Sequence, residues 1–148
     1  MVRPHLARLS PFLHLLISPT PAENLYGMRI LVVDDEPMVQ IFLSQALEEA
    51  GHTVDCAANG VDALQRLHAH AYDLIFTDVH MPRMSGIDFV RAVRRRQPRI
   101  PIVVMDSYPD AFRESDVGAE AFALLAKPFD LDEVRRVLHE VQPYYATR

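Results

Sequence analysis

The feature that most constrains the fold is a regular alternation of short apolar runs with helical patterns, which begins at Met28. Each run is rich in aliphatic residues and is bounded by turn residues, which is typical of strands buried on both faces of a sheet. The predicted strands are residues 29–33, 53–57, 73–77, 100–105 and 121–126.

Apolar residues recur at helical spacing after each of these runs. The predicted helices are residues 37–50, 61–69, 87–97, 109–117 and 131–142, the last ending at Pro143. Short crossovers between parallel strands are right-handed and place helices on both faces of the sheet. The sequence therefore predicts one doubly wound α/β domain with a five-stranded parallel sheet.

The length of 148 residues suits one domain, and a hydrophobic fraction of 49% is enough for a core. Residues 28–142 form the predicted domain, and residues 143–148 a C-terminal tail. Residues 1–27 contain four prolines and an apolar run that is too short to span a membrane. We interpret them as a disordered tail or as an incorrectly assigned start upstream of Met28, with a docking or targeting segment as the alternative.

Composition excludes several classes of site. A single cysteine, Cys56, allows neither an internal disulfide nor a cysteine metal site. The net charge of −5 gives no general reason to expect nucleic-acid binding. An arginine cluster between residues 91 and 99 is interpreted as the solvated C-terminal end of a helix, where positive charge is favourable.

Charged residues follow three of the predicted strands. Asp34 and Asp35 come after the first strand, Asp78 after the third, and Lys127 after the fifth. The carboxyl ends of parallel strands meet at one edge, where open α/β sheets bind their ligands. We therefore expect the three carboxylates and the lysine to lie together, although Asp34 and Asp35 taken alone are also compatible with a cap on the following helix.

Three converging carboxylates repel one another, and a hard cation relieves that repulsion. Mg²⁺ prefers carboxylate, carbonyl and water oxygens. Lys127 adds a compact positive charge that can contact a phosphate. A carboxylate beside both can act as a nucleophile toward a phosphoryl group, with the positive charges neutralising the transferring oxygens. The sequence favours Asp78 for this role.

Together these segments resemble the receiver domain of bacterial two-component response regulators. The resemblance covers residues 28–142 and rests on Asp34-Asp35, on the segment LIFTDVHMPRMSG around Asp78, and on Lys127-Pro128-Phe129, in that order. It implies the flavodoxin-like (βα)5 fold.

The resemblance also implies a role for each matching residue. Asp78 is the phosphoacceptor, and Lys127 contacts the phosphoryl group. Mg²⁺ is the cofactor, held by Asp34, Asp35 and Asp78 together with the backbone carbonyl of His80. Within the acidic pair, Asp35 is favoured as the direct ligand.

Further expectations concern conformation and partners. The Lys127–Pro128 bond is expected to be cis. The phosphoryl donor would be a histidine kinase or a histidine phosphotransfer protein, and a downstream protein would be the target. The domain would be cytoplasmic, a monomer or weak homodimer, and a phosphoacceptor rather than an enzyme, with no membrane or nucleic-acid partner.

Two segments depart from the family pattern. The family has Thr or Ser directly after the fourth strand, where this chain has Asp106 followed by Ser107. An ionised aspartate cannot donate a hydrogen bond. Either Asp106 faces away and Ser107 replaces the hydroxyl, or the switch is altered, or the domain signals without phosphate. The family also often has an aromatic residue three positions before the lysine, where this chain has Leu124, so the fourth helix is shorter or the fifth strand is shifted.

Three function hypotheses follow. The first is a single-domain response regulator in a phosphorelay. The alternative is a phosphate-independent interaction module, or pseudo-receiver, because of Asp106. A true enzyme is disfavoured, since residues 34–37 match neither the Asp-x-Asp-x-Thr motif of aspartate-based phosphatases nor the hydroxyl-rich phosphate loop of flavodoxins.

Overall fold

The computed structural model describes residues 27–146, and the predictions made for residues 1–26 and 147–148 lie outside that part of the chain. The strands are β1 (Arg29–Val33), β2 (Thr53–Ala57), β3 (Leu74–Asp78), β4 (Ile102–Asp106) and β5 (Ala123–Ala126). The helices are α3 (Pro37–Glu49), α4 (Gly60–Ala69), α5 (Gly86–Arg96), α6 (Pro109–Arg113) and α7 (Leu131–Ala146), with a short 3-10 helix η1 (Gly118–Glu120).

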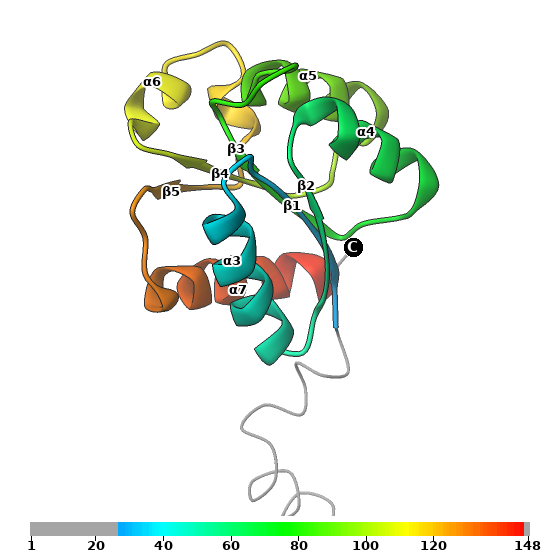
Figure 1. Cartoon of the computed structure of the whole chain (residues 1–148), viewed down its shortest axis with the longest axis vertical. Helices are drawn as coiled ribbons and strands as arrows, with labels where there is room; N and C mark the ends of the chain where they lie inside the picture. The colour runs from blue at the N-terminus through cyan, green and yellow to red at the C-terminus, as the bar shows by residue number, and fades with distance from the viewer. Residues whose placement is uncertain (1–26, 147–148) are drawn as a thin grey trace, which may run out of the picture.

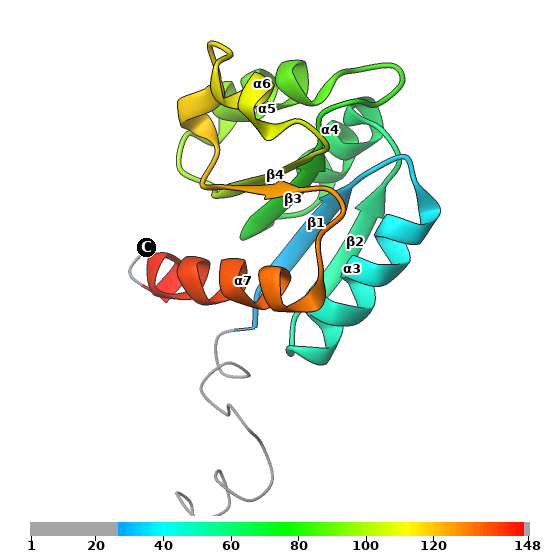
Figure 2. The ribbon, with the colours of Figure 1, turned by 90° about the vertical axis from the view of Figure 1, so that its left-hand side faces the viewer.

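The five strands form one parallel sheet in the order β2-β1-β3-β4-β5. Helices α3 and α7 cover one face of the sheet, and α4, α5 and α6 cover the other (Figures 1 and 2). Alternate residues of β1 enter the two cores on either face, Leu31 and Val33 on one side and Ile30 and Val32 on the other. The doubly wound (βα)5 fold predicted from the sequence is confirmed.

Local signals explain where the helices begin and end. The Asn59 side chain caps α4 by accepting a hydrogen bond from the Asp62 amide. Asp130 and Glu133 exchange hydrogen bonds with each other's amides at the start of α7, as a capping box does. Gly51 follows α3 with a φ of 96°, the left-handed conformation that ends many helices.

Several predicted boundaries were shifted. Strand β3 includes Asp78 as its last residue, and β4 likewise ends on Asp106 rather than on Met105. Strand β5 begins at Ala123, two residues later than predicted, because Ala121 and Phe122 follow the η1 turn. The predicted helix over residues 109–117 is shortened to α6, so the fourth helix is shorter and the fifth strand is shifted as well, which were the two alternatives for this segment.

The predicted helix stop at Pro143 was wrong, because α7 continues through Pro143 to Ala146. The helix therefore includes residues 143–146 of the predicted tail, and residues 147–148 lie outside the described part of the chain. Proline removes one helical hydrogen bond. Tyr144 holds the last turn in compensation, since its ring packs 5.6 Å from that of Phe122 and its hydroxyl donates to the Arg99 carbonyl.

Two arginines of the cluster on α5 are paired with acidic side chains of the segment after α6. Arg91 Nη2 contacts both carboxylate oxygens of Asp116 at 2.5 and 2.7 Å. Arg94 Nε donates to Glu120 at 2.8 Å. These pairs tie α5 to the segment that follows α6.

Within the described residues, no helix is both long and apolar enough to cross a bilayer.

Candidate functional site

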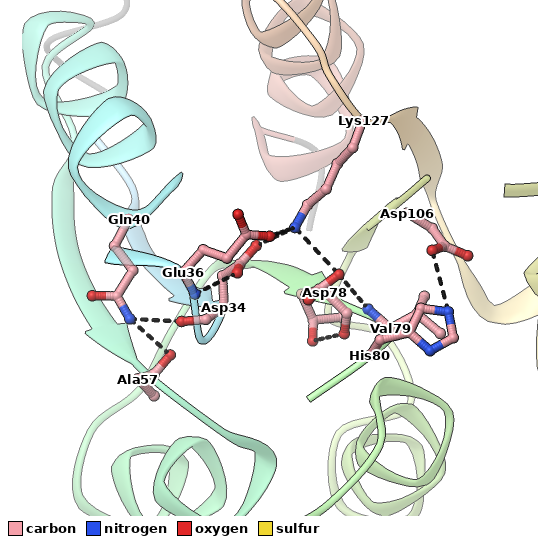
Figure 3. A network of polar contacts seen from close by, with 10 residues as sticks. Asp34, Glu36, Gln40, Ala57, Asp78, Val79, His80, Asp106 and Lys127 are labelled. Atoms are coloured by element: carbon pink, nitrogen blue, oxygen red, sulfur yellow. Dashed lines mark hydrogen bonds and ion pairs between the residues drawn. The ribbon is translucent and has the colours of Figure 1, made fainter. Parts of the chain in front are cut away.

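The carboxyl ends of β1, β3 and β5 bring the predicted site residues together (Figure 3). Oxygens of Asp34, Asp35 and Asp78 lie within 4.8 Å of one another. The Lys127 ammonium lies 2.7 Å from Asp34 Oδ2 and 3.4 Å from Asp78 Oδ1. The predicted convergence of three carboxylates and one lysine is therefore present.

Asp78 is held rigidly at the end of a strand whose five residues are all buried. Its side chain is 8% exposed, and Oδ1 accepts a hydrogen bond of 2.9 Å from the Val79 amide. The following loop is anchored close beneath it, since the Gly86 amide donates to the Val79 carbonyl at 2.7 Å. The Asp78 carboxylate therefore has a fixed position at the edge of the sheet.

The surroundings of Asp78 favour its neutral form. Burial raises the pKa of Asp78, and the charge of Asp34 raises it further. The charge of Lys127, its contact with Asp78 and the Val79 amide act in the opposite direction without cancelling the rise. An added cation at this site would offset the repulsion that keeps the pKa of Asp78 high.

Lys127 is the positive group that the carboxylates share. Burial lowers the pKa of Lys127, but the hydrogen bond to Asp34 and the charges of Asp34 and Asp78 outweigh burial, so the net pKa is raised. Glu36 adds a further contact at 3.3 Å. The peptide bond from Lys127 to Pro128 is cis, as the resemblance implied.

The acidic pair divides into a buried and an exposed member. Asp34 is fully buried, and its Oδ1 accepts a hydrogen bond of 2.9 Å from the Glu36 amide, whereas Asp35 is exposed. Helix α3 has Glu36 at its N-cap with no side-chain cap hydrogen bond. The alternative in which Asp34 or Asp35 caps this helix is therefore wrong, and both carboxylates remain available to a cation.

Two supporting residues were missed in the sequence. Glu36 contacts Lys127 from the loop after β1. Gln40, on α3, donates from Nε2 to the Asp34 carbonyl at 2.6 Å and to the Ala57 carbonyl at 3.4 Å, which joins the ends of β1 and β2. No sequence motif marks Gln40, because its role depends on the angle at which α3 leaves the sheet.

The atypical residue at the end of β4, Asp106, is buried beside His80. Asp106 is 2% exposed, and its Oδ1 lies 3.5 Å from His80 Nε2. Ser107 is exposed and borders an open groove of about 390 Å³ that Lys127 also lines. The side chain of His80 therefore reaches toward Asp106, while its backbone carbonyl as a metal ligand stays a prediction.

The expected family aromatic is absent from β5. Leu124 packs with the core on the α4 and α5 face. Phe122 precedes the strand and packs with the opposite core, beside Tyr144. The sequence predicted Leu124 in place of the family's aromatic residue, and the structure has Leu124 at that position in β5.

Comparisons with known proteins agree with this geometry. Residues 30–139 match the family model of the response regulator receiver domain. The transcriptional regulatory protein TcrA of Mycobacterium tuberculosis is 37% identical over 111 residues, which are 73% of this chain and 43% of TcrA. The chain thus spans less than half the length of the curated relatives it matches.

Solved structures show the same fold. The chemotaxis response regulator CheY4 of Vibrio cholerae has a TM-score of 0.72 and 31% identity, covering 78% of this chain and 98% of CheY4. The response regulator TrrA of Thermotoga maritima, solved in complex with Mg²⁺-BeF, has a TM-score of 0.71 and 32% identity, covering 76% of this chain and 97% of TrrA. This chain belongs to the response regulator receiver domain family.

Proposed function

We propose that Asp78 accepts a phosphoryl group from a phosphohistidine of a histidine kinase or histidine phosphotransfer protein, and that the phosphorylated domain signals to a protein partner. The observation that carries this proposal is the position of Asp78 Oδ1, fixed at a buried strand end 3.4 Å from the Lys127 ammonium and close to two further carboxylates.

The three carboxylates fit a divalent cation. Their oxygens lie within 4.8 Å of one another, two of the three carboxylates are buried, and one lysine cannot neutralise all three. Hard oxygen donors of this kind suit Mg²⁺. Asp34, Asp35 and Asp78 would hold the ion, with the His80 carbonyl as the family resemblance implies. When bound, the ion supplies positive charge that neutralises the oxygens of the transferring phosphoryl group.

The chain's own residues carry the transfer step. The Asp78 carboxylate attacks the phosphorus, a P–O bond forms, and the P–N bond of the phosphohistidine breaks, with the electron pair leaving on the donor imidazole. Lys127 is placed to contact an oxygen of the arriving group while remaining paired with Asp34. On this proposal the chain is a phosphoacceptor and not an enzyme that turns over a separate substrate.

An apolar surface beside the site supports a protein partner. Met38 is 74% exposed and Ile41 51% exposed, both on α3. Met38 lines a groove that Phe42, Lys127 and Phe129 also border. Large exposed apolar side chains next to a reactive site are typical of a protein-binding surface.

We propose that this phosphoryl transfer takes place in the cytoplasm, with the domain acting as a monomer or weak homodimer.

A phosphate-independent interaction module is the second candidate. It is favoured by Asp106, which stands where the family has a hydroxyl and leaves one buried oxygen unpaired. On this alternative, partner binding would be unchanged by Asp78→Asn.

The first experiment is intact-mass spectrometry after incubation with acetyl phosphate and Mg²⁺. We expect one phosphoryl adduct on the unmodified chain and none on Asp78→Asn, with Asp55→Asn, a strand aspartate outside the site, labelled normally. Equal labelling of Asp78→Asn would overturn the assignment. No adduct on a folded chain would favour the phosphate-independent module.

A further inference from the structure

One buried carboxylate oxygen has no partner at the edge of the site. Among the described residues, Asp106 Oδ1 is the buried side-chain oxygen without a hydrogen bond. The Asp106 side chain is 2% exposed, so water does not replace the missing donor at its surface. A buried carboxyl oxygen without a donor loses its hydrogen bonds to water on folding and gains none in return. A nearby donor is therefore expected to serve this oxygen.

His80 is placed to be that donor. Its Nε2 lies 3.5 Å from Asp106 Oδ1, just beyond hydrogen-bond distance, and its side chain is 77% exposed and free to turn. Figure 3 shows the imidazole against the Asp106 carboxylate, on the side of Asp78 away from Asp34. An imidazole that carries its proton on Nε2 donates one hydrogen bond whether or not the ring is charged.

The other positive group of the site is already used. The Lys127 ammonium contacts Asp34, Glu36 and Asp78, and only its backbone amide reaches Asp106, at the main-chain carbonyl. A phosphoryl group on Asp78 would add about −1.5 to −2 charge next to the Asp106 carboxylate. Asp106 follows Met105, which pairs with Asp78 across β3 and β4, so the two like charges would lie on neighbouring strand ends and repel each other.

We propose that His80 is a positioning residue that makes phosphorylation compatible with Asp106. His80 Nε2–H pairs with Asp106 Oδ1 and holds that carboxylate away from the phosphoryl group on Asp78. His80 takes no part in the bond changes, in which the donor's bond to phosphorus breaks and the Asp78 P–O bond forms. This inference rests on the proposed phosphorylation of Asp78.

The test is a double-mutant cycle of labelling rates. The rate of adduct formation with acetyl phosphate and Mg²⁺ is followed by intact mass in the unmodified chain, His80→Ala, Asp106→Asn and the double variant. We expect His80→Ala to slow labelling about tenfold when Asp106 is present, but less than about twofold in the Asp106→Asn background, as for two residues in direct contact.

Two further variants separate hydrogen bonding from general effects. His80→Gln keeps an amide donor that does not titrate, and we expect it to restore labelling to within about threefold of the original rate. His139→Ala removes an exposed histidine on α7 and serves as the control. The melting temperature of every variant shows that a slow rate does not come from unfolding.

Three outcomes would overturn the inference. If His80→Ala is labelled at the original rate, His80 has no role. If it slows labelling equally in both backgrounds, His80 does not act through Asp106. Both results leave the proposed phosphorylation standing, whereas an unmodified chain that never labels overturns that function and the role of His80 together.

Discussion

Asp55 and Asp78 are both carboxylates on strands of the sheet, yet their surroundings differ. Asp55 Oδ2 accepts hydrogen bonds from the Tyr72 hydroxyl at 2.6 Å and from Arg29 Nη2 at 2.9 Å and Nε at 3.1 Å. Burial alone would raise the pKa of Asp55, but the hydrogen bonds from Tyr72 and Arg29, together with the charges of Arg29 and Arg66, outweigh burial and lower it. The ionised form of Asp55 is therefore stabilised by three hydrogen bonds to one of its oxygens.

Asp78 has the opposite balance. It receives one amide hydrogen bond and shares Lys127 with Asp34 and Glu36. Burial and the Asp34 charge raise the pKa of Asp78 above its ordinary value. The comparison shows that the negative charge of Asp55 is balanced by its own neighbours and stabilises the fold. The carboxylates around Asp78 carry more negative charge than Lys127 balances, and a bound cation would offset that excess.

The largest expected effect comes from the backbone that positions Asp78. A Cβ on Gly86 would lie 2.2 Å from the Asp78 carbonyl oxygen and 2.7 Å from Val79 Cα, both backbone atoms that cannot turn aside. We expect Gly86→Ala to lower the free energy of unfolding by about 3 kcal/mol, at the upper end of overpacking effects. Urea unfolding gives this value.

Gly60→Ala is the matched control. Its Cβ would meet Cβ, Cγ and Sδ of Met84 at 2.9 Å; the Cγ and Sδ atoms can turn aside, whereas the Cβ atom moves only with the backbone of its loop. A smaller loss, of about 1 to 2 kcal/mol, is expected there, because no backbone atom meets the new Cβ directly. If both variants lose the same free energy of unfolding, the close packing of Gly86 against the backbone of Asp78 and Val79 is not a special constraint.

The second test removes a donor from the Asp55 cluster. Tyr72→Phe keeps the ring under Arg29, which lies 5.3 Å from the ring centroid, but deletes the hydrogen bond to Asp55. We expect a loss of about 1–2 kcal/mol in the free energy of unfolding, as for a hydrogen bond to a charged group. Tyr108→Phe, at a residue that is 75% exposed, should change it by less than about 0.5 kcal/mol.

The same hydrogen bond gives a pH dependence. Burial, together with the hydrogen bond to Asp55, raises the pKa of Tyr72 to about 12. The stabilisation should be complete below the ordinary phenol pKa of about 10 and should fall as the pH rises toward the value in the folded protein. A difference between wild type and Tyr72→Phe that persists unchanged into that range would contradict the assignment.

The smallest expected effect has the opposite sign. Because the folded state raises the pKa of Asp78, the ionised carboxylate destabilises the fold as the pH rises through that pKa. Asp78→Asn should therefore increase the free energy of unfolding at pH 7 without Mg²⁺, by about 1 kcal/mol from relief of the repulsion with Asp34. The gain should vanish near pH 3, where both states hold the carboxyl neutral.

Asp55→Asn sharpens this comparison, since it weakens the contacts with Arg29 and Tyr72 and should destabilise the protein under the same conditions. Thermal unfolding of both variants in EDTA gives the two signs. If Asp78→Asn instead lowers the stability at neutral pH, then Lys127 and the Val79 amide outweigh the repulsion from Asp34, and the prediction is wrong.

The sequence was sufficient to predict the fold and the convergence of Asp34, Asp35, Asp78 and Lys127. The reason is that these residues lie at strand ends, and the parallel topology alone brings such ends together. The apolar runs fixed the strands to within two residues, because each run is bounded by turn residues or charges.

Features that depend on tertiary packing could not be predicted in this way. The direction of the Asp106 side chain and its unpaired oxygen follow from the way β4 meets the His80 loop. The passage of α7 through Pro143 depends on the contact between Tyr144 and Phe122, which are far apart in the sequence. The function of Gln40 likewise exists only once α3 is docked.

The most direct test of the central claim is to locate the phosphoryl group. Borohydride reduces an aspartyl phosphate to homoserine, so chains treated with acetyl phosphate and Mg²⁺ can be reduced, digested and sequenced by mass spectrometry. The account predicts homoserine at position 78 and at no other aspartate. Homoserine at position 34, 35 or 106 instead, or at none, would contradict it.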